Sequence, residues 1–255
     1  MPDRPTMDDP PPFSCLALHG LGGGPYELAP MIAALGGAGV RVEAPTLPGH
    51  EGPGPIMPAS DWREWADAAG AAFDRLEAHG APVAVAGFST GATLALLLAH
   101  RRPAARLVLL APFLAIRFSR LIPIRPAGYL RPISRVFPHL PRRPPAARDP
   151  EARRLVGASA LYRTFSLRAV LSALELIDEV RPLVPKIRTP TLILQGRRDT
   201  VVDPAGASWL ADHLGSEHKE LIWLPRSDHL LTHDHDRDRV IGASVAFLTG
   251  RDGPA

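Results

Sequence analysis

A serine stands at the centre of the pentapeptide Gly87-Phe88-Ser89-Thr90-Gly91, between two apolar runs at residues 82–86 and 92–99. This order predicts a strand, a sharp turn and a helix, with the Ser89 hydroxyl exposed at the turn as a nucleophile. A turn this tight needs glycine two places before and after the serine, because a side chain there would block the backbone. The N–H groups at the start of the helix would then face an anion formed at Ser89.

Ser89 needs two partners, because a serine hydroxyl is too weakly acidic to attack an ester near neutral pH. Asp199 follows the apolar run 191–195, and His229 follows the apolar run 219–224. The carboxyl ends of parallel strands lie along one edge of a sheet, so we expect serine, histidine and aspartate to meet there. The presence of all three residues favours a catalytic serine over an ordinary serine in a strand-to-helix turn.

Asp203 is the alternative acid, because it lies four residues after Asp199 in the same loop. It directly precedes Pro204, where a helix is predicted, and an aspartate at that place commonly caps the helix. We therefore assign the acid to Asp199.

A metal site is the alternative for the histidines near residue 230. His229, His233 and His235 alternate with Asp234 and Asp236. One of these two aspartates more simply begins the last helix as its N-cap, with His233 and His235 facing solvent. The chain has no second cluster of ligand residues, so we expect no metal and no cofactor.

The elements that must position these residues alternate along the chain, which predicts a parallel sheet with helices on both faces. The predicted strands are 13–18, 40–44, 82–87, 106–111, 191–195 and 219–224, and the predicted helices are 26–35, 61–79, 92–100, 204–214 and 236–248.

This alternation divides the chain into four segments. Residues 1–12 are rich in proline and predict a disordered leader. Residues 13–111 and 183–250 form the α/β core, and residues 112–182 interrupt it. Prolines break any long regular element in the first half of this insertion, and two helices are predicted in its second half, residues 151–180.

Five motifs together resemble the α/β-hydrolase family, most closely its small bacterial carboxylesterases and monoacylglycerol lipases. They are His19-Gly20-Leu21-Gly22-Gly23, Leu47-Pro48-Gly49-His50, the Ser89 pentapeptide, Gln195-Gly196-Arg197-Arg198-Asp199 with Val201-Val202-Asp203, and Ser227-Asp228-His229. The resemblance implies an α/β-hydrolase fold in its reduced version of about six strands, since no segment before Phe13 predicts the two extra strands of larger members.

The resemblance also implies roles for individual residues. The N–H groups of Leu21 and Thr90 are expected to form the oxyanion hole. His19 is expected to be a structural hydrogen-bonding residue, whereas the role of His50 stays open. The insertion 112–182 is expected to be a cap over the nucleophile, and within it Ile133 and Phe137 are predicted to line an acyl pocket.

Composition excludes several classes of protein. The 255 residues are 45% hydrophobic and 22% charged, as in globular proteins, and the formal net charge is only +3. No basic run is interleaved with aromatic residues, so no nucleic-acid partner is expected. No apolar run approaches the roughly 20 residues of a membrane span, and no apolar signal core begins the chain. The single cysteine, Cys15, is interpreted as a packing residue, and we expect a cytoplasmic protein.

The predicted function is that of a serine hydrolase acting on carboxylic esters of short to medium acyl chains, including monoacylglycerols, through an acyl-enzyme on Ser89. The same triad would also serve an acyltransferase or a thioesterase. A non-catalytic binding module is a further alternative, although such modules usually lack a triad member. The sequence leaves the oligomeric state open.

Overall fold

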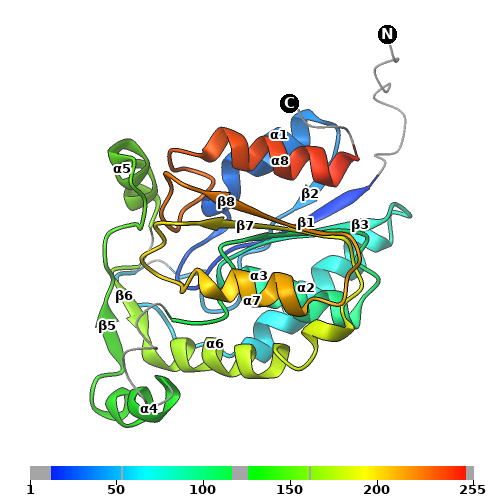
Figure 1. Ribbon diagram of the computed structural model, residues 1–255. Helices are drawn as coiled ribbons and strands as arrows, with labels where there is room; N and C mark the ends of the chain where they lie inside the picture. The colour runs from blue at the N-terminus through cyan, green and yellow to red at the C-terminus, as the bar shows by residue number, and fades with distance from the viewer. Residues whose placement is uncertain (1–12, 53, 117–125, 161, 251–255) are drawn as a thin grey trace.

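A six-stranded parallel sheet crosses the centre of the computed structural model, which describes residues 13–52, 54–116, 126–160 and 162–250 (Figure 1). Its strand order is β2-β1-β3-β4-β7-β8, and every neighbouring pair is parallel. The strands are β1 (Ser14–Leu18), β2 (Arg41–Glu43), β3 (Val83–Phe88), β4 (Leu107–Leu110), β7 (Thr191–Gly196) and β8 (Lys219–Leu224). The expected six-stranded α/β-hydrolase sheet is therefore confirmed. The predicted leader, residues 1–12, lies outside the described residues.

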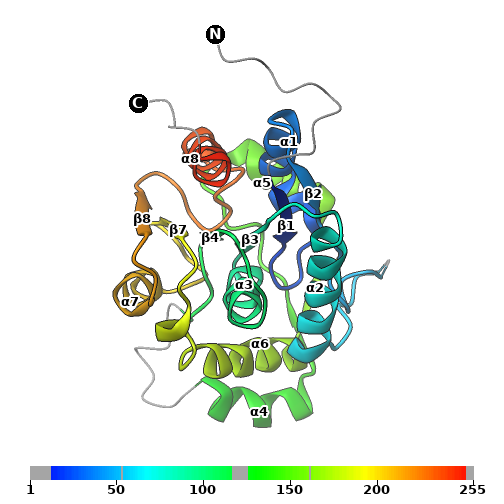
Figure 2. The same cartoon turned by 90° about the vertical axis from the view of Figure 1, so that its right-hand side faces the viewer.

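Helices cover both faces of this sheet (Figure 2). On one face lie α1 (Ala29–Gly37), which follows the short helix η1 (Pro25–Leu28), and α8 (Arg237–Thr249). On the other face lie α2 (Trp62–Glu77), α3 (Thr90–Arg101) and α7 (Ala205–His213). Each of these helices falls where the apolar periodicity predicted one.

The strands are apolar on both sides because both faces are covered. Along β1, Leu16 points into the core beneath α2 and α3, whereas Cys15 points into the core beneath α1 and α8. Burial raises the pKa of the Cys15 thiol to about 12, so this side chain stays protonated and packs as a small apolar residue. Trp62 and Trp65 of α2 are also buried, in the same core as Leu16.

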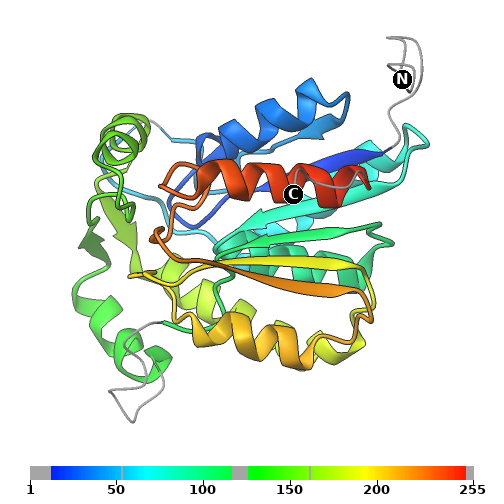
Figure 3. The same cartoon turned by 45° about the horizontal axis from the view of Figure 1, so that its top comes forward.

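In its described residues, the insertion between β4 and β7 carries three α-helices and a strand pair. These are α4 (Pro126–Val136), β5 (His139–Pro141), α5 (Pro150–Ser159), β6 (Thr164–Ser166) and α6 (Leu167–Val180), with η3 (Val184–Lys186) leading into β7. The antiparallel pair β5–β6 and helix α5 lie beyond the carboxyl ends of the parallel strands (Figures 1 and 3). Helix α6 packs against α2 and α3, and α4 packs on α6. Helix α4 continues through Pro132 and ends before Pro138.

Among the helices that the structure describes, none has the length and apolar character required to cross a bilayer.

Candidate active site

Ser89 occupies the turn between β3 and α3 in a strained backbone conformation, with φ 55° and ψ −118°. The two flanking glycines make this turn possible. A Cβ added to Gly87 would lie 2.3 Å from the Gly91 carbonyl oxygen, and a Cβ added to Gly91 would lie 2.2 Å from that of Leu18. The expectation of an exposed hydroxyl is wrong for this conformation, because Ser89 is only 7% exposed.

Two hydrogen bonds join Ser89, His229 and Asp199. The His229 Nε2 atom lies 3.0 Å from the Ser89 Oγ atom, and its Nδ1 atom lies 2.8 Å from an Asp199 carboxylate oxygen. A carboxylate only accepts, so the imidazole proton belongs on Nδ1, and Nε2 is free to accept the serine proton. The structure thus brings together the three residues that the sequence selected.

Asp199 is fully buried and held from several sides. One carboxylate oxygen accepts from the N–H groups of Val201 at 2.8 Å and Val202 at 2.9 Å, and the other also accepts from the Gln195 amide at 3.0 Å. These donors fix the orientation of the carboxylate toward His229.

The electrostatics of this pair favour a charged Asp199 and a readily protonated His229. Burial opposes the charged form of both groups. Their mutual attraction and hydrogen bond outweigh this effect, so the pKa of Asp199 is lowered and the pKa of His229 is raised above its ordinary value. The arrangement suits a histidine that becomes charged during a reaction beside an aspartate that stays ionised.

The loop that carries His229 is anchored to the insertion. The Ala146 carbonyl oxygen accepts from the N–H groups of both His229 and Leu230, each at 3.0 Å. The buried Asp234 carboxylate accepts at 2.8 Å from the N–H groups of Asp228 and Arg148. The histidine is therefore positioned by residues 146–148 as well as by the sheet.

The loop after β1 is held by three side chains from different parts of the chain. The Gly20 N–H donates to the Glu27 carboxylate at 2.9 Å, the Gly22 N–H donates to His50 Nε2 at 2.9 Å, and the Arg142 guanidinium donates to the Gly22 carbonyl oxygen. These contacts fix the backbone on both sides of Leu21.

Neither the Leu21 N–H nor the Thr90 N–H donates a hydrogen bond to another described residue. A Cβ added to Gly20 would lie 3.2 Å from the Ser89 Cβ atom, so the Leu21 loop borders the serine closely. Both donors proposed for the oxyanion hole thus remain available beside Ser89.

Both histidines in the Leu21 region act as neutral hydrogen-bonding residues. His19 Nε2 accepts from the Leu47 N–H at 3.0 Å, and its Nδ1 donates to the Gly20 carbonyl oxygen at 2.9 Å. Burial, together with neighbouring His50, lowers the pKa of His19 to about 3, and burial also lowers the pKa of His50. Sequence reasoning left His50 open and missed Glu27 and Arg142, because no local pattern links them to the loop they hold.

The alternative acid and the remaining histidines have other contacts. Asp203 accepts from the Ala205 N–H at 3.0 Å, at the start of α7, but Pro204 holds the N-cap position of this helix, so Asp203 lies one residue before the cap. His235 is exposed as expected, but His233 is half-buried and donates to the Tyr26 carbonyl oxygen at 3.0 Å, so it does not face solvent. Asp236 stands at the N-cap position of α8, yet its side chain bonds Arg226 and Ser227 instead of the helix.

No group of three or more metal-binding side chains occurs within the described ranges.

The two residues predicted for the acyl pocket lie on the outer side of the insertion. Ile133 is within α4 and is 40% exposed, and Phe137 directly follows this helix and is 62% exposed. In this conformation neither side chain is enclosed. Residues 117–125 of the predicted cap lie outside the described residues.

Comparisons with known proteins agree with this geometry. The family described as serine aminopeptidase, S33, matches residues 9–236. A thermostable monoacylglycerol lipase of Bacillus sp. (strain H-257) is 25% identical over 95% of this chain and 92% of its own length. A chain from the structures of the metagenome-derived lipolytic enzymes LipS and LipT superposes with a TM-score of 0.83 at 25% identity, covering 93% of this chain and 94% of that one. A monoacylglycerol lipase of Paleococcus ferrophilus has the same fold, with a TM-score of 0.81, 23% identity and coverage of 95% and 96%.

Proposed function

This chain belongs to the α/β-hydrolase family described as serine aminopeptidase, S33, and is an ester hydrolase; on that premise we propose that its substrates are carboxylic esters of short to medium acyl chains, including monoacylglycerols. The hydrogen-bonded path from Asp199 through His229 to Ser89 is the observation that carries the proposal. We also propose that residues 112–182 act as a cap over this site. The proposed location of the protein is the cytoplasm.

The proposed reaction has two steps. The Ser89 oxygen attacks the ester carbonyl carbon while its proton moves to His229 Nε2, and Asp199 stabilises the imidazolium. The oxyanion accepts hydrogen bonds from the N–H groups of Leu21 and Thr90, and one such donor is worth roughly 3 kcal/mol in related chemistry. The alcohol leaves with the proton from His229. Water then attacks the acyl-enzyme and gives a proton to His229, and His229 passes this proton to the Ser89 oxygen as the bond to the acyl group breaks and the carboxylic acid leaves.

The acid limb of the pH profile follows from His229, which must be neutral to accept the serine proton. Because the pKa of His229 is raised, kcat/KM should fall with acid around a midpoint above the ordinary histidine value of about 6.5. Glu27 contributes to this shift, since its charged form favours protonated His229, and burial raises the pKa of Glu27 itself to about 7. Glu27→Gln should therefore move the midpoint to lower pH, as measured by kcat/KM from pH 5 to 9.

Treatment with EDTA should leave this activity unchanged at every pH, because no step of the proposed reaction uses a metal. Loss of turnover with EDTA, and its recovery on adding zinc, would contradict the assignment of His229 as a free base.

Acyl specificity should depend on the cap. Each additional CH₂ buried in a pocket contributes roughly 0.8 kcal/mol, or about fourfold in kcat/KM, until the pocket is full. On p-nitrophenyl esters, kcat/KM should rise from acetate to a short or medium optimum and then fall. Ile133→Ala and Phe137→Ala should move this optimum if the cap rearranges to bring them over Ser89.

Leu155→Ala is the matched control for these two variants, because Leu155 is an exposed apolar residue on α5. A profile that is flat in acyl length, or that all three variants leave unchanged, would exclude Ile133 and Phe137 from the pocket. Monoacylglycerols, acyl-thioesters and aminoacyl amides belong in the same screen, and analysing the products with an added alcohol separates hydrolysis from acyl transfer.

A further inference from the structure

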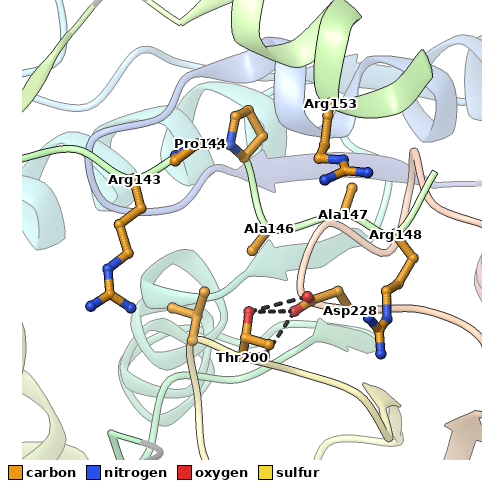
Figure 4. Close-up of a pocket in the computed structure, with 10 residues that line it drawn as sticks. Arg143, Pro144, Ala146, Ala147, Arg148, Arg153, Thr200 and Asp228 are labelled. Atoms are coloured by element: carbon orange, nitrogen blue, oxygen red, sulfur yellow. Dashed lines mark hydrogen bonds between the residues drawn. The ribbon is translucent and has the colours of Figure 1, made fainter. Parts of the chain in front are cut away.

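A hollow of about 370 Å³ lies between the insertion and the loops that follow β7 and β8 (Figure 4). One wall is residues 143–148, together with Arg153 from α5. The opposite wall is Thr200, Val201 and Asp228. Its volume suits a small polar group, since it is far larger than one water molecule.

Three arginines stand around this hollow. Figure 4 shows the guanidinium groups of Arg143, Arg148 and Arg153 on three sides of it. All three residues are exposed, and none of the three guanidinium groups pairs with an acidic side chain among the residues placed in the structure. The neighbouring Arg154, by contrast, forms an ion pair with Glu151 at 2.6 Å.

The acidic groups near the hollow are already engaged. Asp228 accepts from the Thr200 N–H at 2.8 Å and from the Thr200 hydroxyl at 2.9 Å. Asp149 pairs with Arg237 at 3.4 Å, and Asp234 is buried among backbone N–H groups. Three arginine charges against the single lining carboxylate of Asp228 leave a net charge of +2 around the hollow.

Two residues that line the hollow are also direct sequence neighbours of Asp199 and His229. Thr200 follows Asp199, and Asp228 precedes His229. The backbone of Ala146, which lines the hollow, accepts both hydrogen bonds that hold the His229 loop. A ligand in this position would therefore lie beside the acid–base pair without using it.

We propose that this hollow is a binding site for a phosphate group, held by Arg143, Arg148 and Arg153. A phosphate monoester carries a charge of about −1.5 to −2 at neutral pH, which matches the local charge, and its oxygens accept paired hydrogen bonds from guanidinium groups. The phosphate belongs either to the ester substrate or to a separate small molecule. This site goes beyond the proposed ester hydrolysis, which needs no anion.

Binding is tested without any catalytic step, by titrating the whole protein with inorganic phosphate and pyrophosphate in a calorimeter at pH 7.5 and fixed ionic strength. The triple variant Arg143→Gln, Arg148→Gln and Arg153→Gln should weaken pyrophosphate binding at least tenfold, because charge-assisted hydrogen bonds are lost. The matched control is Arg63→Gln, Arg101→Gln and Arg154→Gln, which removes the same charge from exposed positions outside the hollow and should change binding less than twofold.

Thermal unfolding verifies that both triple variants are folded, and the single variants Arg143→Gln and Arg153→Gln decide the question if the triple variant is not. Absence of saturable binding to the unaltered protein, or equal weakening in the two triple variants, would overturn the proposal.

The source of the phosphate is found by comparing 1-octanoylglycerol with 1-octanoylglycerol 3-phosphate, which differ only in that group. If the phosphate belongs to the substrate, the ratio of kcat/KM for the charged over the neutral ester should fall at least tenfold in the arginine triple variant and stay constant in the control. An unchanged ratio, together with lost pyrophosphate binding, assigns the site to a separate phosphate compound. An unchanged ratio with unchanged pyrophosphate binding refutes the site, even in a fully active hydrolase.

Discussion

Ser89→Ala is expected to lower kcat for p-nitrophenyl butyrate about a millionfold, because the triad acts as a unit and the nucleophile is its first member. The fold should persist, since alanine is smaller than serine and Ser89, which it replaces, is itself a non-glycine residue at positive φ. The double variant Ser89→Ala with His229→Ala should be hardly slower than Ser89→Ala alone, because the base has no role without the serine.

Ser244→Ala is the matched control for Ser89→Ala. Ser244 is also a buried serine, but its hydroxyl donates to the Val240 carbonyl oxygen within α8. Its removal should leave kcat close to the wild-type value. Purified Ser89→Ala protein with near wild-type turnover would refute the mechanism.

Asp199→Asn is expected to lower kcat about ten-thousandfold. The N–H groups of Val201 and Val202 both donate to one Asp199 oxygen, so they would hold the asparagine oxygen in that place. The asparagine NH₂ group would then face His229 Nδ1, which must become an acceptor. The imidazole proton would move to Nε2, and a protonated Nε2 cannot accept the proton of Ser89.

Asp203→Asn is the control for this substitution, because it alters an aspartate in the same loop. Asp203 accepts a hydrogen bond from the Ala205 N–H, and the asparagine oxygen can accept the same bond, so the change should leave both turnover and the free energy of unfolding nearly intact. Measuring kcat and urea unfolding for both variants separates the two roles. Greater loss of turnover in Asp203→Asn would reverse the assignment of the acid.

The sheet and its helices were predictable because apolar periodicity reflects burial directly. Strands covered on both faces are continuously apolar, as in β3 and β4, and amphipathic helices such as α2 repeat their apolar residues every three or four positions. The Ser89 turn was also visible, since its two glycines are needed within five residues of chain.

The insertion was less predictable, since an isolated helix shows which residues are apolar but not what they contact. Ile133 and Phe137 have the residue types of a pocket lining, yet they lie on the exposed side of α4 and directly after it. Likewise, nothing in the sequence indicated that His233 would turn away from solvent to donate to the Tyr26 carbonyl oxygen, 207 residues away.

The sequence by itself determined the strand and helix order of the α/β core and selected Ser89, Asp199 and His229, which the structure brings together, because turn geometry and burial are encoded within short segments. Only the tertiary structure decided what holds the loop after β1 and the loop that carries His229. Glu27, His50 and Arg142 lie 7, 28 and 120 residues from the glycines they bond, and Ala146 lies far from His229 along the chain. Contacts at such separations depend on how the elements pack, which leaves no periodic or local trace in the sequence.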